Sequence, residues 1–151
     1  MKAVVLSGGL GTRLRPYTLF VPKPMLPLAE KPLLQYIIEW LHKNGVKDMV
    51  MSVGYLRKSI EDYFLDGKDF DVNIDYVRLN NPLGTAGQLK EVEPHLDSRF
   101  ICLYGDSFYN FDLKDAISFH TKKSSLATIV LKKYKTSLKY VGENLEVELK
   151  G

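Results

Sequence analysis

The sequence predicts an α/β protein with a doubly wound, mostly parallel sheet. Short apolar segments typical of buried strands alternate with longer segments whose apolar residues recur at helical spacing. Glycine and proline separate the two kinds of segment, and this alternation is typical of parallel strands joined by crossover helices. With 151 residues, 45% of them hydrophobic and 26% charged, the chain suits one domain with a substantial core.

Five segments are predicted as strands. Residues 3–6 form an apolar run that is too short for a helix, and residues 48–53 are similarly apolar. Residues 100–104 are apolar throughout, so we expect them to form a central strand. Residues 72–77 alternate apolar and polar side chains, which indicates a strand near an edge of the sheet. Residues 126–131 form the fifth predicted strand.

Four segments have the apolar spacing of helices: 33–41, 58–65, 86–93 and 113–122. Gly45 is expected to stop the first helix, in which Tyr36 and Trp40 are interpreted as packing residues. Thr85 and Asp112 are expected to cap the third and fourth helices. The last stretch of the chain indicates only a weak strand, at residues 145–149.

The net charge of +3 is unevenly distributed along the chain. Residues 1–35 contain five Lys or Arg and one acidic residue, whereas the remaining 116 contain sixteen basic and seventeen acidic residues. A local positive charge suits a small anionic ligand, and it lacks the extent of the basic stripe that marks a nucleic-acid binder. We therefore expect no nucleic-acid partner.

Cys102 is the only cysteine, so it excludes an intramolecular disulfide and a cysteine zinc site. Its apolar surroundings predict a buried thiol in a reducing compartment. Neither a signal peptide nor a segment of membrane-spanning length is visible. These observations predict a cytoplasmic protein without a membrane partner.

Residues 7–27 are the most distinctive segment of the chain. Three glycines there leave backbone N–H groups open to a polyphosphate, and three basic side chains add positive charge. Four prolines exclude a regular helix or a central strand, so we expect a stiff loop suited to phosphoryl chemistry. These residues are Gly8, Gly9 and Gly11, Arg13, Arg15 and Lys23, and Pro16, Pro22, Pro24 and Pro27.

Two familiar glycine-rich motifs do not fit this loop. A dinucleotide-binding fingerprint needs a third glycine where Leu14 stands, and Pro16 would interrupt its helix. A Walker loop needs Lys-Ser or Lys-Thr directly after Gly11, but the lysine comes only at Lys23. The simplest alternative is a glycine-rich turn with incidental basic residues.

Three ordered motifs give the sequence a specific resemblance. The first is Leu6-Ser-Gly-Gly-Leu-Gly-Thr-Arg-Leu-Arg-Pro-Tyr-Thr with Pro22-Lys-Pro-Met-Leu-Pro and Lys31-Pro. Pro82-Leu-Gly-Thr-Ala-Gly and Gly105-Asp106 follow it. Together they resemble the N-terminal signature of the nucleoside-triphosphate:sugar-1-phosphate nucleotidyltransferases, the NDP-sugar pyrophosphorylases. The resemblance covers residues 1 to about 131 and implies a Rossmann-like nucleotidyltransferase fold, incomplete at its C-terminus within this sequence.

The resemblance also implies roles for individual residues. Arg13 and Lys23 would be catalytic cations on the triphosphate, and Asp106 would hold Mg²⁺. The nucleotide-binding residues would be Leu6, Gly8, Gly9, Gly11, Thr12, Gly84 and Thr85, with the last two against the base and ribose. Leu79 stands where the family frequently has Gln or Glu near the base.

The residues themselves support Asp106 and leave alternatives open. Asp106 follows an apolar strand, where open α/β sheets bind ligands, and a carboxylate oxygen suits magnesium. Asp106 could instead cap a turn, and a role as helix cap would explain Thr85 equally well.

The family's Glu-Lys-Pro motif, whose lysine grips the sugar phosphate, and its later metal-binding aspartate are absent from these 151 residues. We therefore expect residues 1–151 to form the nucleotide-binding part of a nucleotidyltransferase domain, without the sugar-binding half or any C-terminal domain. The implied reaction joins an NTP and a sugar 1-phosphate into an NDP-sugar and pyrophosphate. The alternative is a non-catalytic regulatory subunit or truncated relative that only binds nucleotide. The sequence names neither the base nor the sugar, and it leaves a homo-oligomer open.

Overall fold

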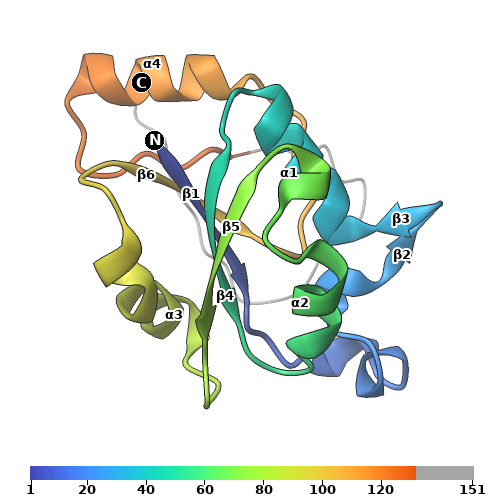
Figure 1. The fold of residues 1–151 in the computed structure, drawn as a ribbon. Helices are drawn as coiled ribbons and strands as arrows, with labels where there is room; N and C mark the ends of the chain where they lie inside the picture. The colour runs from blue at the N-terminus through green and yellow to red at the C-terminus, as the bar shows by residue number, and fades with distance from the viewer. Residues whose placement is uncertain (132–151) are drawn as a thin grey trace, which may run out of the picture. The chain divides into compact units, whose positions relative to one another are not determined.

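The computed structural model describes residues 1–131 (Figure 1). The chain divides into two compact units, Met1–Leu113 and Lys114–Gly151. The first unit contains every strand found among residues 1–131 and every candidate site residue. The weak strand expected at residues 145–149 lies outside the described residues.

A four-stranded parallel sheet with the order β5-β4-β1-β6 forms the centre of the first unit. Its strands are β1 (Lys2–Ser7), β4 (Asp48–Val53), β5 (Asn73–Arg78) and β6 (Phe100–Tyr104). Every neighbouring pair is parallel, with Leu6 of β1 opposite both Ser52 of β4 and Tyr104 of β6. The predicted parallel sheet is confirmed, and residues 72–77 lie at an edge of the sheet that residues 1–131 form.

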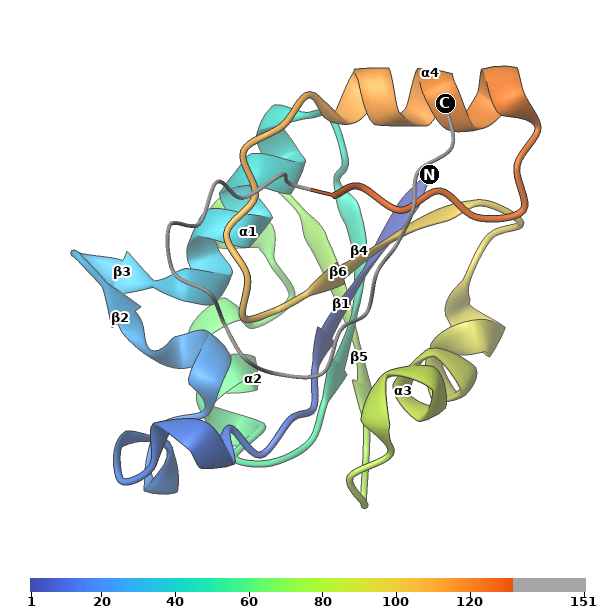
Figure 2. The same cartoon turned by 180° about the vertical axis from the view of Figure 1, so that it is seen from behind.

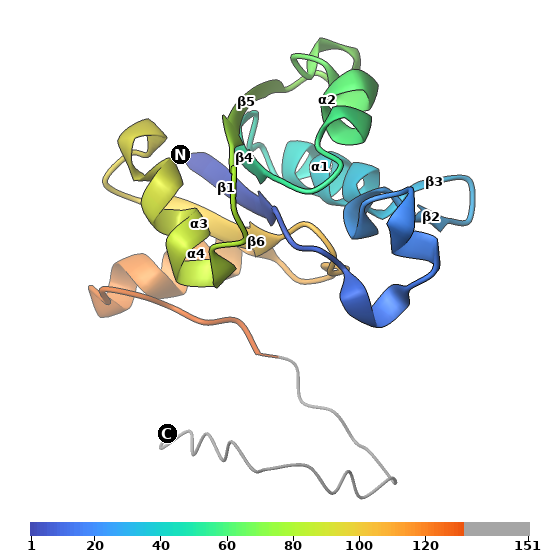
Figure 3. The same ribbon diagram turned by 90° about the horizontal axis from the view of Figure 1, so that it is seen from below.

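Helices cover both faces of this sheet, as a doubly wound fold requires (Figure 3). Helices α1 (Leu33–Lys43) and α2 (Lys58–Phe64) lie on one face, and α3 (Gly84–Val92) lies on the other. Because successive strand residues point to opposite faces, Val4 and Val50 pack with Val92 of α3. The fully buried Ile37, Ile38 and Leu41 of α1 supply the core on the other face.

The central position predicted for residues 100–104 and the strand predicted at residues 126–131 are wrong. Residues 100–104 form β6 at the edge of the described sheet, because only β1 pairs with β6 among residues 1–131. Cys102 is therefore exposed, and the predicted buried thiol is wrong. Residues 126–131 form no strand, and Leu126 and Ile129 remain largely exposed, so apolar character there does not by itself create strand pairing.

The helix predictions agree with the structure. Gly45 follows α1 with a left-handed φ of 80°, as expected for a helix stop. The fourth helix is α4 (Leu113–Lys123), which begins directly after Asp112. The capping role of Asp112 stays a prediction.

Among residues 1–131, no helix combines the length and apolar character needed to cross a bilayer.

Between β1 and α1 the chain forms short turns instead of regular elements, as the prolines predict. Three 3-10 turns span Thr12–Leu14, Tyr17–Leu19 and Lys23–Met25. A small antiparallel pair, β2 (Pro27–Leu28) and β3 (Lys31–Pro32), then leads into α1.

Candidate functional site

A cleft of about 290 Å³ lies at the carboxyl ends of β1 and β6. These two ends meet because the strands are parallel neighbours (Figure 2). The walls of the cleft come from the loop after β1, the end of β6 and helix α3. The lining residues are Leu6, Ser7, Gly9, Gly11, Thr12, Arg13, Leu14, Lys23, Pro24, Gln88, Tyr104 and Asp106. Seven of the ten predicted site residues are among them: Leu6, Gly9, Gly11, Thr12, Arg13, Lys23 and Asp106.

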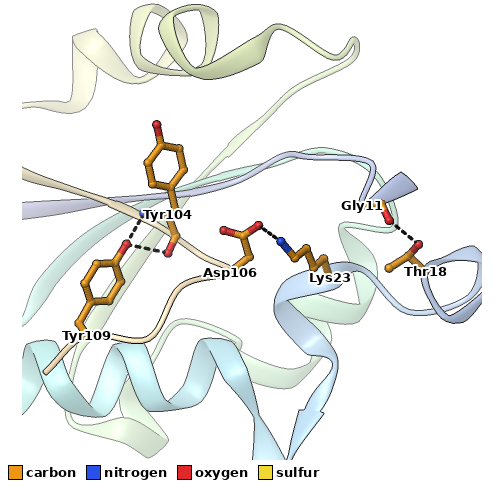
Figure 4. A network of polar contacts seen from close by, with 6 residues as sticks. All are labelled: Gly11, Thr18, Lys23, Tyr104, Asp106 and Tyr109. Carbon is orange, nitrogen blue, oxygen red and sulfur yellow. Dashed lines mark hydrogen bonds and ion pairs between the residues drawn. The ribbon is translucent and has the colours of Figure 1, made fainter. Parts of the chain in front are cut away.

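Gly11 shapes the loop after β1. Its φ of 62° is left-handed, and a Cβ there would come within 3.0 Å of Thr18 Cγ2. The Gly11 carbonyl accepts hydrogen bonds from the Thr18 hydroxyl at 2.8 Å and the Leu14 amide at 3.0 Å (Figure 4). These two hydrogen bonds fix the turn Thr12–Leu14, which carries Arg13 to the cleft.

The two arginines of the loop are placed differently. Arg13 lines the cleft, but Arg15, two residues later, does not. Both side chains are exposed. The geometry therefore separates Arg13, which can contact a ligand in the cleft, from Arg15, which contributes only to the surrounding positive field.

Lys23 and Asp106 join the two loops across the cleft. Lys23 Nζ donates to Asp106 Oδ2 at 2.5 Å, and Figure 4 shows the two side chains pointing toward one another. Their side chains remain 37% and 34% exposed, so a ligand in the cleft can reach both groups. The reading of Asp106 as a simple turn cap does not explain this ion pair.

Close backbone packing places Asp106 beside β1. The Gly105 amide donates to the Leu6 carbonyl at 2.9 Å. A Cβ at Gly105 would lie 2.1 Å from Ser7 Oγ, so a side chain there would force the Ser7 hydroxyl to move. The buried Ser7 hydroxyl has no hydrogen-bond partner among the described residues.

Tyr109 stabilises the carboxyl end of β6. Its hydroxyl accepts from the Tyr104 amide at 2.8 Å and donates to the Tyr104 carbonyl at 3.2 Å (Figure 4). Burial raises the pKa of Tyr109 above its usual range, so the hydroxyl stays protonated and can make both bonds. Trp40 of α1 packs against Tyr109 and Phe111, with ring centroids 5.5 and 5.0 Å apart. The packing role expected for Trp40 is thus to support the loop that carries Asp106.

Gln88 of α3 is a site residue that the sequence reasoning missed. Its side-chain oxygen accepts from the Gly8 amide at 3.1 Å and from the Ser52 hydroxyl at 2.6 Å. Gly8 is therefore buried below the cleft with its N–H already bonded, and it does not line the cleft as predicted. Leu79 packs against Gly8 in the same region, since a Cβ on Gly8 would meet Leu79 Cδ1 at 2.6 Å. Gln88 stands one helical turn after Gly84, a spacing that could have pointed to it.

Gly84 and Thr85 lie outside the cleft lining. The helix begins at Gly84 with Leu83 in the capping position, and no side chain caps it. The prediction that Thr85 caps the helix is therefore wrong. Its hydroxyl instead lies 3.5 Å from the hydroxyl of Tyr104, which does line the cleft.

The residues present fit a magnesium ion held jointly with phosphate. Among residues 1–131, no three His, Cys, Asp or Glu side chains gather as a metal cage. Asp106 supplies one accessible carboxylate in the cleft. One carboxylate with phosphate oxygens and waters is an arrangement that Mg²⁺ accepts.

Comparisons with known proteins agree with this architecture. A family model described as nucleotidyl transferase matches residues 2–141. The UTP--glucose-1-phosphate uridylyltransferase of Synechocystis sp. is 38% identical over 144 residues, covering 87% of this chain and 37% of the relative. A mannose-1-phosphate guanyltransferase of Gibberella zeae is 40% identical over 144 residues, covering 93% and 40%. The crystal structure of HddC from Yersinia pseudotuberculosis complexed with GMP-PN is 33% identical, with a TM-score of 0.72, covering 79% and 53%.

The chain spans 37% to 53% of the length of these three proteins. The structural likeness confirms the Rossmann-like nucleotidyltransferase fold that the motifs imply. Since the family model matches most of the sequence, this chain belongs to the nucleotidyl transferase family.

Proposed function

We propose that this chain supplies the NTP and Mg²⁺ site of an enzyme that transfers a nucleotidyl group to a sugar 1-phosphate. The observation that carries the proposal is the meeting of Arg13, Lys23 and Asp106 in one cleft at the carboxyl ends of β1 and β6. Relatives named as sugar-1-phosphate uridylyl- and guanyltransferases support the choice of reaction.

In this reaction an oxygen of the sugar 1-phosphate attacks the α-phosphorus of the NTP. The bond from the α-phosphorus to the bridging oxygen breaks, and pyrophosphate leaves with the electron pair. The attacking phosphate is already a nucleophile, so the protein needs no covalent intermediate. Its contribution is to position the reactants and to stabilise developing negative charge.

Each residue of the cleft suits one part of this task. The planar guanidinium of Arg13 can grip phosphate oxygens with two hydrogen bonds, and Lys23 acts as a compact point charge. Gly9 and Gly11 bring backbone close to the phosphates without side chains in between. Asp106 would hold Mg²⁺, which when bound supplies neutralisation of phosphate charge. We propose that the reaction takes place in the cytoplasm, where a lone thiol suits the reducing conditions.

Calorimetry with and without Mg²⁺ tests the assignment of Asp106. Asp106→Asn keeps the shape of the side chain but removes its charge, so the gain in NTP affinity that Mg²⁺ provides should shrink about tenfold or more. Asp97→Asn, on an exposed position before β6, is the matched control and should bind as wild type. An Asp106→Asn variant with wild-type Mg²⁺ dependence but a lower melting temperature would make Asp106 a structural residue.

Pyrophosphate release in the presence of several sugar 1-phosphates tests whether residues 1–151 only bind the nucleotide or also position the sugar phosphate. Residues 1–151 should bind Mg²⁺·NTP but turn over sugar phosphate poorly, because the family's sugar-phosphate lysine has no counterpart in this sequence. Fixing the acceptor in place contributes about 7–11 kcal/mol to such reactions. Robust release that depends on a sugar 1-phosphate would show that this chain also positions the acceptor.

A further inference from the structure

The charged side chains that line the cleft and the uncharged amide of Gln88 come from different elements. Arg13, Lys23 and Asp106 belong to the loops after β1 and β6, whereas Gln88 belongs to α3. Figure 3 shows α3 and the loop after β1 on opposite sides of the carboxyl end of β1. A nucleotide whose phosphates lie against Arg13 and Lys23 can therefore extend its base toward α3, where Gln88 lines the cleft.

The amide group of Gln88 has a defined orientation. A backbone N–H can only donate, so the atom that faces the Gly8 amide at 3.1 Å must be the side-chain oxygen. The Ser52 hydroxyl, which is fully buried, donates to the same oxygen at 2.6 Å. These two bonds fill the acceptor capacity of the amide and leave its NH₂ group as the polar group for a ligand. No side chain or backbone group among residues 1–131 is seen to bond that nitrogen.

We propose that Gln88 selects nucleotides whose base carries a carbonyl oxygen at the position where adenine and cytosine carry an amino group. This inference rests on the proposed function. The Gln88 NH₂ can donate to O6 of guanine or O4 of uracil and thymine, but it meets another donor at the amino group of adenine or cytosine. The buried, apolar Leu79 beside Gly8 leaves Gln88 as the residue suited to read this edge.

Calorimetry with Mg²⁺ complexes of GTP, ATP, UTP and CTP tests this assignment. GTP with ATP and UTP with CTP form two pairs of equal ring size, so the affinity ratio within a pair reports the exocyclic group. In the wild type, at least one of the two ratios should favour the carbonyl base by about tenfold. In Gln88→Glu the carboxylate still accepts from Gly8 and Ser52 but has no donor, so that ratio should fall to about one or invert.

Two controls isolate the donor. Asn81→Asp adds the same negative charge on the exposed turn before α3 and should lower all four affinities without changing the ratios. Ser52→Ala removes one of the two bonds that orient Gln88, so the ratio should fall by a smaller factor, about threefold. A thermal melt of each variant establishes that it is folded.

The outcomes separate the inference from the function on which it rests. If no nucleotide binds to the wild type, the proposed function fails. If nucleotides bind but both ratios are near one, or the ratio survives Gln88→Glu, then Gln88 only holds Gly8 in place and the inference is wrong.

Discussion

The loops that follow β1 and β6 carry functional side chains to the same cleft but are held in different ways. The loop after β1 is fixed within itself, by the left-handed Gly11, the Thr18 hydroxyl on its carbonyl, and closely spaced prolines. The loop after β6 is fixed from outside, by Tyr109 bonded to the end of the strand and by Trp40 of α1 packed behind it. Local chemistry therefore shapes one wall of the cleft, and tertiary packing shapes the other.

The largest effect should come from removing Arg13. Arg13→Ala removes a charge aimed into the cleft, and such losses typically cost about 2–4 kcal/mol in transition-state or ligand stabilisation. Arg15→Ala changes only the surrounding field and should cost well under 1 kcal/mol at physiological salt. Nucleotide calorimetry on both variants makes the comparison, and equal losses would contradict the separate placement of the two arginines.

Gly11→Ala should destabilise the first loop. Forcing a side chain into the left-handed region costs roughly 1–2 kcal/mol, and the new methyl group would also press on Thr18. Gly9→Ala is the matched control, because a Cβ there meets nothing within 4 Å and its φ is not left-handed. Denaturant unfolding separates the two variants, because Gly11→Ala should lose stability and Gly9→Ala should not; nucleotide affinity does not separate them, since both glycines line the cleft. A Gly11→Ala protein as stable as Gly9→Ala would show that the left-handed glycine does not shape this loop.

A smaller effect is expected in the second loop from Tyr109→Phe. The substitution keeps the ring packed on Trp40 but removes both hydrogen bonds to Tyr104, so the free energy of unfolding should fall by about 1 kcal/mol. Because Asp106 lies two residues beyond Tyr104, the gain in nucleotide affinity from Mg²⁺ should also fall about threefold. Tyr63→Phe removes a hydroxyl bonded to Gln35 away from the cleft and should leave this gain unchanged. If Mg²⁺ raises the nucleotide affinity of Tyr109→Phe as much as that of the wild type, Tyr109 does not support the site.

The same contrast explains which features could be predicted. Strands 48–53 and 72–77, the helices and the stiff loop after β1 follow from apolar periodicity and from glycine and proline, which act on neighbouring residues. The support from Tyr109 and Trp40 joins residues 69 positions apart, and no local pattern contains that information. The edge position of β6 was missed because apolar composition reports burial propensity and does not report which strand pairs with which.

The candidate site divides in the same way. Arg13, Lys23 and Asp106 stand in motifs and all three line the cleft, while their roles there stay predictions. Gln88 carried no motif, and its place beside Gly8 depends on how α3 packs against β1 and β4. Gly8 itself shows the limit of motif reading, because its uncovered N–H is used inside the protein.

Nuclear magnetic resonance of the chain labelled with ¹⁵N-glycine tests most directly the claim that one cleft between these loops binds the nucleotide. During titration with Mg²⁺·GTP or Mg²⁺·UTP, the amide signals of Gly9, Gly11 and Gly105 should shift together along a single binding curve. Gly45, after α1, and Gly67, after α2, serve as internal controls, and their amide signals should not shift. Saturable shifts confined to Gly45 and Gly67, or no response of Gly9 and Gly11 to any nucleotide, would contradict the account.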